Sequence, residues 1–112
     1  MSKVFVTQQS LTRDNNGAWR PKFDLTPAQH FGELEYIFGS GQMGLMPEAV
    51  YDAAENRLDE LDYRCEEDYL LATGDMVLAC QVSYLMMMRG GCRMLRWDSK
   101  LRTYSVYEML GE

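Results

Sequence analysis

The sequence has only three cysteines and one histidine, which limits the disulfide and metal chemistry open to it. Cys65, Cys80 and Cys92 are odd in number and widely spaced, and no C-x-x-C pair occurs, so we expect no disulfide framework. A four-ligand zinc site would need all three together with His30, without the paired spacing of such sites. We interpret the cysteines as free thiols in a reducing cytoplasm, and we expect no metal or cofactor.

Long apolar segments are also missing from the sequence. The longest apolar stretch, Met76–Met88, is interrupted by Gln81 and Ser83, and it is shorter than the roughly 20 residues that a membrane-spanning helix needs. The first residues contain no extended apolar run of the kind found in signal peptides. These features predict a cytoplasmic protein that does not associate with membranes.

Basic residues are the minority, because 11 Lys and Arg stand against 17 Asp and Glu and give a formal net charge of −6. This charge disfavours a domain that coats nucleic acid by bulk attraction to phosphates. It suits a protein that meets basic protein surfaces, because long-range attraction speeds the encounter. The 112 residues, 46% of them apolar, predict one domain over residues 1–112 with one core.

The first third of the chain predicts β-structure with one short helix. Residues 4–9 have the Val and Phe content of a strand. The Asn and Gly residues at 14–17 are a turn signal, and they predict a hairpin whose second arm is 18–23. Thr26 is expected to cap a short helix. Acidic and apolar side chains alternate over 33–38, which predicts a half-buried strand.

Two main helices are predicted in the second half of the chain. An amphipathic helix is expected over 47–61, with its apolar side chains on one stripe. A second helix is expected over 76–89, with Thr73 or Asp75 as its cap. Its side chains are apolar nearly all round, which is typical of a helix buried against a sheet.

Two further β-segments complete the predicted fold. Residues 69–71 predict a short strand between the helices, and residues 92–108 predict a C-terminal β-hairpin. The order of these elements indicates an α+β protein, a single small domain. We expect a mixed or antiparallel sheet with the two main helices on one face and the hairpin at its end.

One glycine-rich segment matches the G-x-G-x-x-G pattern through Gly39, Gly41 and Gly44. It follows a predicted strand and precedes a predicted helix, as the dinucleotide fingerprint requires. However, Pro47 places the helix start after the motif, and no P-loop Lys-Ser or Lys-Thr pair follows. We interpret the segment as a loop and keep a small nucleotide-binding protein as an alternative.

An acidic cluster, here called the acidic segment, lies after the first main helix. It consists of Asp59, Glu60, Asp62, Glu66, Glu67 and Asp68. Arg64 alone offsets it. The glycine and acid spacing of a calcium loop is absent, so we reject that loop. Two interpretations remain: a surface for a basic partner, or a solvated helix end.

The C-terminal hairpin has the opposite charge. Five basic residues and Asp98 between positions 89 and 102 give a local balance of +4. The candidate binding residues of this basic-aromatic hairpin are Arg93, Arg96, Trp97, Lys100, Arg102 and Tyr104. Trp, Tyr and Arg dominate protein interfaces, and a basic-aromatic surface also binds single-stranded nucleic acid. A plain exposed hairpin is the third interpretation.

Catalysis has little support in the sequence. The only histidine is His30, and neither Ser40 nor Cys65 has motif partners nearby. The acidic residues carry no distance information from which a carboxylate mechanism could be argued. We assign no catalytic residue, and we favour a protein that is not an enzyme.

Three segments carry a resemblance to a known group of proteins. They are Phe23-Asp24-Leu25-Thr26-Pro27-Ala28, Tyr69-Leu70-Leu71-Ala72-Thr73-Gly74-Asp75 and Met94-Leu95-Arg96-Trp97-Asp98. These segments resemble small uncharacterised proteins encoded by tailed bacteriophages and related mobile elements. The resemblance implies an accessory protein in a bacterial host cytoplasm that acts by binding, without any activity or residue role to transfer.

We therefore expect a non-enzymatic binding protein, a phage-type accessory factor that engages a host protein. The acidic segment and the basic-aromatic hairpin are its two candidate surfaces. Single-stranded nucleic-acid binding by the hairpin is the alternative from another class. The sequence leaves self-association open.

Overall fold

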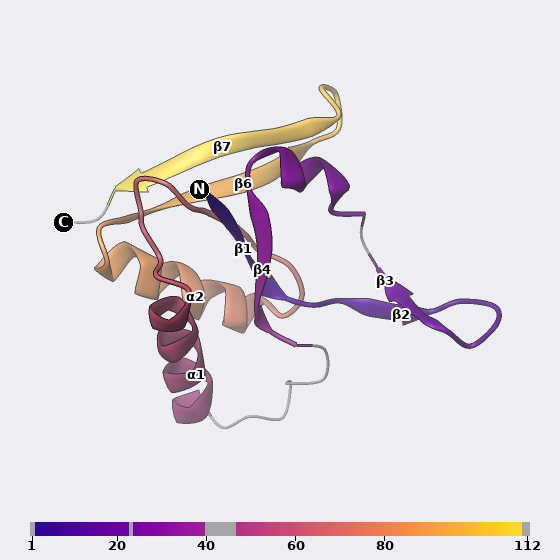
Figure 1. The fold of residues 1–112 in the computed structure, drawn as a ribbon, viewed down its shortest axis with the longest axis horizontal. Coiled ribbons are helices and arrows are strands. Elements are labelled where there is room, and N and C mark those ends of the chain that lie inside the picture. The colour runs from indigo at the N-terminus through magenta and orange to yellow at the C-terminus, as the bar shows by residue number, and fades with distance from the viewer. Residues whose placement is uncertain (1, 23, 40–46, 111–112) are drawn as a thin grey trace.

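The structure is a computed structural model that describes residues 2–22, 24–39 and 47–110. Its main sheet has five strands in the order β4-β1-β5-β6-β7 (Figure 1). The first four are parallel, and β7 pairs antiparallel with β6. The strands are β1 (Lys3–Gln8), β4 (Glu33–Phe38), β5 (Tyr69–Leu71), β6 (Gly91–Asp98) and β7 (Thr103–Leu110). The predicted α+β class, mixed sheet and C-terminal hairpin are confirmed.

The remaining elements connect these strands. They are the hairpin strands β2 (Leu11–Arg13) and β3 (Trp19–Pro21), the 3₁₀ helix η1 (Thr26–His30), and the helices α1 (Pro47–Glu60) and α2 (Met76–Met88). Among the described residues, no helix is long and apolar enough to cross a bilayer. The main helices begin where Pro47 and Asp75 predict, and each ends one residue before its predicted end.

Strand β1 lies in the middle of the sheet rather than in an N-terminal hairpin. It pairs in parallel with β4 on one side and with β5 on the other. Residues 4–8 are all buried, as expected for a parallel strand covered on both faces. The hairpin predicted between residues 4–9 and 18–23 was therefore wrong in its first arm. The turn at 14–17 instead joins β2 to β3.

Helices α1 and α2 pack together on one face of the sheet, as predicted. The core on that face contains Phe5, Phe38, Leu58, Leu70, Val82 and Met86. The short helix η1 covers the other face. The core there contains Val4, Val6, Ala28, Leu71 and Leu95. Fully burying a side chain of this size contributes roughly 1.5–3 kcal/mol, so both faces stabilise the sheet.

Helix α2 packs against the sheet as predicted, but it is buried on one side only, although its side chains are apolar nearly all round. Its buried side chains are Leu78, Val82, Leu85 and Met86. Its large exposed apolar side chains are Met76, Val77, Tyr84 and Met88. These two sets occupy opposite sides because the sheet and α1 cover only one half of the helix, and no further described layer packs outside it.

Helix η1 also differs in detail from its prediction. Thr26 is the first helical residue and does not cap, and the N-cap position is Leu25, which makes no side-chain hydrogen bond. Asp24 organises this start instead, because its Oδ1 accepts a hydrogen bond from the Thr26 backbone N–H at 3.0 Å. Hydrogen bonds from the Thr26 hydroxyl and, second, from its backbone N–H lower the pKa of Asp24.

Candidate functional site

A cavity of about 1050 Å³ lies beside the end of β5 and the first turn of α2, and we call it the hairpin cavity. Its apolar lining includes Leu25, Pro27, Leu71, Ala72, Met76, Ala79, Met94, Leu95, Trp97, Tyr104 and Tyr107. Its polar lining includes Lys22, Asp24, Thr73 and Arg96. A mostly apolar hollow with a few polar groups is the usual form of a binding site.

The aromatic wall of the cavity comes from the C-terminal hairpin. Trp97 on β6 lies directly opposite Tyr104 on β7, and the two rings meet edge to face with centroids 5.2 Å apart. Phe31 contacts Tyr104 from the opposite side, at 6.4 Å between centroids. Trp97 still exposes 46% of its surface and Tyr107 exposes 51%, so a rigid wall presents open aromatic surface.

The segment between β5 and α2 is held to the end of β1 by two hydrogen bonds. The Thr73 hydroxyl donates to the Gln8 backbone oxygen at 2.7 Å, and the Asp75 backbone N–H donates to Gln8 Oε1 at 2.9 Å. Gly74 between them has φ +81 and leaves no room for a Cβ, because the Gln8 side chain lies against it. This side of the cavity is therefore fixed by the backbone.

The N-terminus of α2 is occupied by a side chain of the protein. Asp75 Oδ1 accepts hydrogen bonds from the backbone N–H groups of Val77 and Leu78, at 2.8 and 3.2 Å. Because Asp75 already accepts from these donors, the N-terminus of α2 offers no free anion site, whereas the predicted dinucleotide loop precedes α1. Two of the three motif glycines, Gly41 and Gly44, lie outside the described residues.

Three of the six residues of the acidic segment form ion pairs within the molecule. Asp59 accepts from Arg89 at 2.7 Å between Oδ1 and Nη1. Glu60 and Asp62 pair with Arg57 and Arg64 at 3.3 and 3.1 Å. Such exposed ion pairs each contribute about 0–1 kcal/mol, so their main effect is to lower the local negative potential.

Asp68 is buried and does not belong to the acidic surface that the sequence predicts. Its two carboxylate oxygens accept hydrogen bonds from the backbone N–H groups of Lys3 and Arg64, at 2.9 and 2.8 Å. This carboxylate ties the start of β1 to the loop before β5. Glu66 and Glu67 stay exposed, and the Cys65 thiol donates to Glu66 at 3.4 Å.

The basic residues of the hairpin separate into two groups. Arg93 is directed at the acidic segment, because its Nη2 donates to the Glu67 backbone oxygen at 2.9 Å and its guanidinium stacks over Tyr69. Arg96, Lys100 and Arg102 are exposed, and their side chains make no ion pair among the described residues. Arg96, Trp97 and Tyr104 alone of the six predicted hairpin residues line the cavity.

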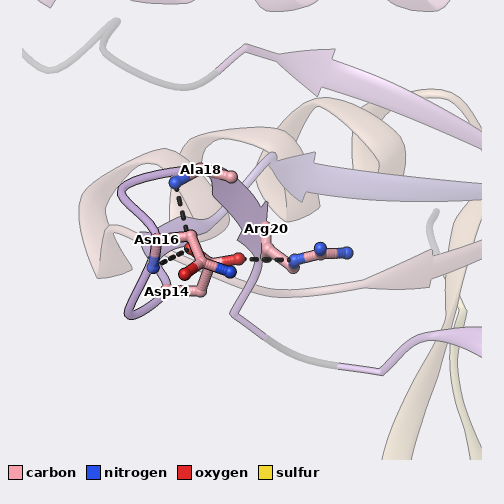
Figure 2. A network of polar contacts seen from close by, with 4 residues as sticks. All are labelled: Asp14, Asn16, Ala18 and Arg20. Atoms are coloured by element: carbon pink, nitrogen blue, oxygen red, sulfur yellow. Dashed lines mark hydrogen bonds and ion pairs between the residues drawn. The ribbon is translucent and has the colours of Figure 1, made fainter.

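A second basic-aromatic surface lies on β2–β3, which extends away from the main sheet (Figure 1) and which we call the finger, residues 11–21. Its turn is organised by Asp14, whose carboxylate accepts from the backbone of Asn16 and Ala18 and from Arg20 Nε (Figure 2). The hydrogen bond from Arg20 lowers the pKa of Asp14. Trp19 is 60% exposed beneath the guanidinium of Arg13, at 4.7 Å.

The cysteines and His30 form no metal site in the described part of the chain, where no three His, Cys, Asp or Glu side chains gather. Cys65 is half-buried, Cys80 is exposed and Cys92 is buried. Burial raises the pKa of the Cys92 thiol to about 11, so this thiol stays protonated at neutral pH. His30 is exposed on η1.

Sequence reasoning missed the cavity as a unit. Leu25, Met76 and Trp97 come from distant parts of the chain, and only the fold brings them to one place. It also missed Trp19, although a tryptophan directly after an Asn-Gly turn has little chance of burial. An exposed tryptophan beside an arginine was the available signal.

The fold and the site together define the class: a small α+β protein with an aromatic-walled cavity where its parallel strands meet a C-terminal hairpin. The chain belongs to the Phage Pam3 gp32-like protein family, whose family model matches residues 2–110. The resemblance to small phage-encoded proteins is thereby confirmed. No curated protein and no solved structure matched the chain.

Proposed function

We propose that this protein is a non-enzymatic binding protein, a phage-type accessory factor that engages a host protein in the bacterial cytoplasm. The observation that carries the proposal is the hairpin cavity, which combines about 1050 Å³ of mostly apolar space with the exposed rings of Trp97 and Tyr107. Aromatic anchors in a well-packed hollow are the typical centre of a protein interface.

The chemistry of the lining indicates what the partner presents. The apolar wall suits one or two large apolar side chains, because burying each contributes roughly 1.5–3 kcal/mol. Exposed Arg96 also lines the cavity and suits a carboxylate near the apolar anchor. The partner segment is therefore an apolar stretch flanked by an acidic residue.

We rank the acidic segment second among the proposed surfaces, because three of its carboxylates, Asp59, Glu60 and Asp62, form ion pairs inside the molecule. Glu66 and Glu67 remain exposed and keep part of it accessible. The long-range effect of the −6 net charge is on the rate of encounter with a basic partner. The cavity would supply the specific contacts.

The test compares host-lysate capture by the unchanged protein and by two single variants. Trp97→Ala removes the cavity wall, and Trp19→Ala removes the other exposed tryptophan as a matched control. We expect one host protein to be retained by the unchanged protein and by Trp19→Ala, and to be lost with Trp97→Ala. Retention of the same protein by all three would refute the cavity as the binding site.

Binding in the cavity can also be followed directly. Trp19→Phe leaves Trp97 as the sole tryptophan, since the chain has two. Adding the captured host protein, in a form without tryptophan, should then shift the Trp97 emission to shorter wavelength as the ring loses water. An unchanged emission spectrum with binding intact would place the contact elsewhere.

The second candidate is single-stranded nucleic-acid binding, which the exposed Arg96, Trp97 and Tyr107 in the cavity lining favour. Its probe is a labelled oligothymidine strand. Salt-sensitive binding that is lost with Trp97→Ala would establish this candidate in place of the first. The net charge of −6 disfavours it, so we expect no binding at physiological salt.

A further inference from the structure

The two edges of the main sheet are β4 and β7, and they differ in length and charge. β4 has six residues and carries Glu33 and Glu35. β7 has eight residues, and Glu108 is its only charged side chain. Charged residues on an edge strand keep other strands from pairing with it, so β4 is protected and β7 is not.

The geometry of β7 is that of an open template. Eight consecutive residues of β7 pair with β6 from Gly91↔Leu110 to Asp98↔Thr103, and no bulge interrupts the described register. Among the described strands β7 pairs with β6 alone, and it runs along the outer side of the sheet (Figure 1). Its outward N–H and C=O groups are therefore available to another strand.

The side chains of β7 add an apolar component to this edge. Val106 is 41% exposed and Leu110 is 82% exposed. β7 contains no proline, the other common device that prevents edge pairing. A long, regular edge with exposed apolar side chains and one charge is the pattern that adds a further strand.

We infer that a second copy of this chain pairs antiparallel with β7, forming a two-fold symmetric dimer with one continuous sheet. The sequence of β7 is self-complementary around Ser105. A two-fold axis at that residue places Val106 opposite Tyr104 of the second copy, which is a favourable aromatic–aliphatic pair. The same axis pairs Thr103–Tyr107 strand to strand and brings Glu108 toward Arg102 in the β6–β7 turn of the second copy, so opposite charges meet.

The experiment measures the oligomeric state by analytical ultracentrifugation. Val106→Lys puts a charge beside the axis, and Val77→Lys makes the same change at an exposed residue of α2, away from the edge. We expect dimers for the unchanged protein and for Val77→Lys, and a folded monomer for Val106→Lys, with circular dichroism confirming the fold. A monomeric unchanged protein, or a dimer broken by Val77→Lys instead, overturns the inference.

A charge swap tests the register. Glu108→Arg and Arg102→Glu should each weaken the dimer, on the order of tenfold because each pair occurs twice. The double variant should restore the affinity. A double variant that dimerises no more tightly than the single variants rules out the Ser105 axis.

Discussion

The two β-hairpins of this protein share local chemistry and differ in their surroundings. In each, one aspartate of the turn accepts hydrogen bonds from two backbone N–H groups: Asp14 in the finger and Asp98 in β6–β7. Each hairpin also carries one of the two tryptophans near its turn, Trp19 in the finger and Trp97 in β6–β7. The sequence signals for the two hairpins are therefore alike.

The difference lies in what each hairpin packs against. β6–β7 has eight cross-strand pairs and buries Cys92 and Leu95 in the two cores. The finger has three cross-strand pairs, and none of its described residues is buried. A two-stranded hairpin alone is marginal in water, so turn chemistry selects the hairpin while packing determines its stability.

The largest expected effect comes from removing a core leucine of β6–β7. Leu95→Ala should lower the free energy of unfolding by about 2–4 kcal/mol, because it leaves a cavity in a packed face. The matched finger variant Leu11→Ala should lower it by less than about 1 kcal/mol. Urea unfolding measures both. Equal losses would mean that the finger unfolds with the sheet.

Replacing each of the two tryptophans should give the next largest difference in unfolding free energy between the hairpins. Trp97→Ala removes the edge-to-face contact with Tyr104 and should cost about 1–2 kcal/mol of unfolding free energy. Trp19→Ala should cost less than about 0.5 kcal/mol, because its ring is mostly exposed and lies under the Arg13 guanidinium on an otherwise unburied finger. Thermal unfolding followed by circular dichroism distinguishes these values, and a Trp19→Ala loss as large as that of Trp97→Ala would break the comparison.

Acid should loosen the finger through Asp14. The pKa of Asp14 is lowered in the folded state, mainly by its hydrogen bond from Arg20. A lowered pKa means that this contribution is present above the unfolded pKa and is lost as the pH falls through the folded one. The Trp19 indole signal in NMR spectra should therefore hold its folded position below the usual aspartate range, then move. In Asp14→Asn the signal should show no such transition.

The mildest probe changes no residue and compares thiol reactivity. Cys92 at the start of β6 is buried with a pKa raised to about 11, so it should not react with a thiol reagent at neutral pH. Exposed Cys80 should react at once and serves as the internal control. Mass spectrometry counts the modified sites. Rapid modification of Cys92 without denaturant would show that β6–β7 opens as easily as the finger.

The sequence predicts the elements of this fold well where the signal is local. The alternation of acidic and apolar side chains predicts β4, Pro47 predicts the start of α1, and Asp75 predicts the cap of α2. The strand partners were harder, because β1 was assigned to a hairpin although it pairs with β4 and β5. Parallel pairing joins residues that are far apart in the chain, and no local pattern encodes it.

The candidate site residues, like the secondary-structure elements, were predictable where the sequence signal is local and not where it depends on tertiary contacts. Trp97 and Tyr104 lie together because they are opposite each other across a local hairpin, and Arg96 is the strand neighbour of Trp97, so the sequence could identify all three. Asp68 was assigned to a surface because its neighbours are acidic, yet its carboxylate is buried and binds backbone N–H groups. Composition predicts average exposure, whereas burial of one carboxylate depends on tertiary contacts.

The central position of β1 has a consequence for how the chain reaches its final form. Val4 pairs with Leu34 on one side and with Tyr69 on the other, so both neighbours of this early strand lie far along the chain. Closing such large loops costs entropy before any contact repays it, which slows folding. We expect β6–β7 to form early and the insertion of β1 between β4 and β5 to be the slow event. Until then, the apolar side chains and unpaired edges of β1 are exposed, which makes this state the one most prone to aggregation.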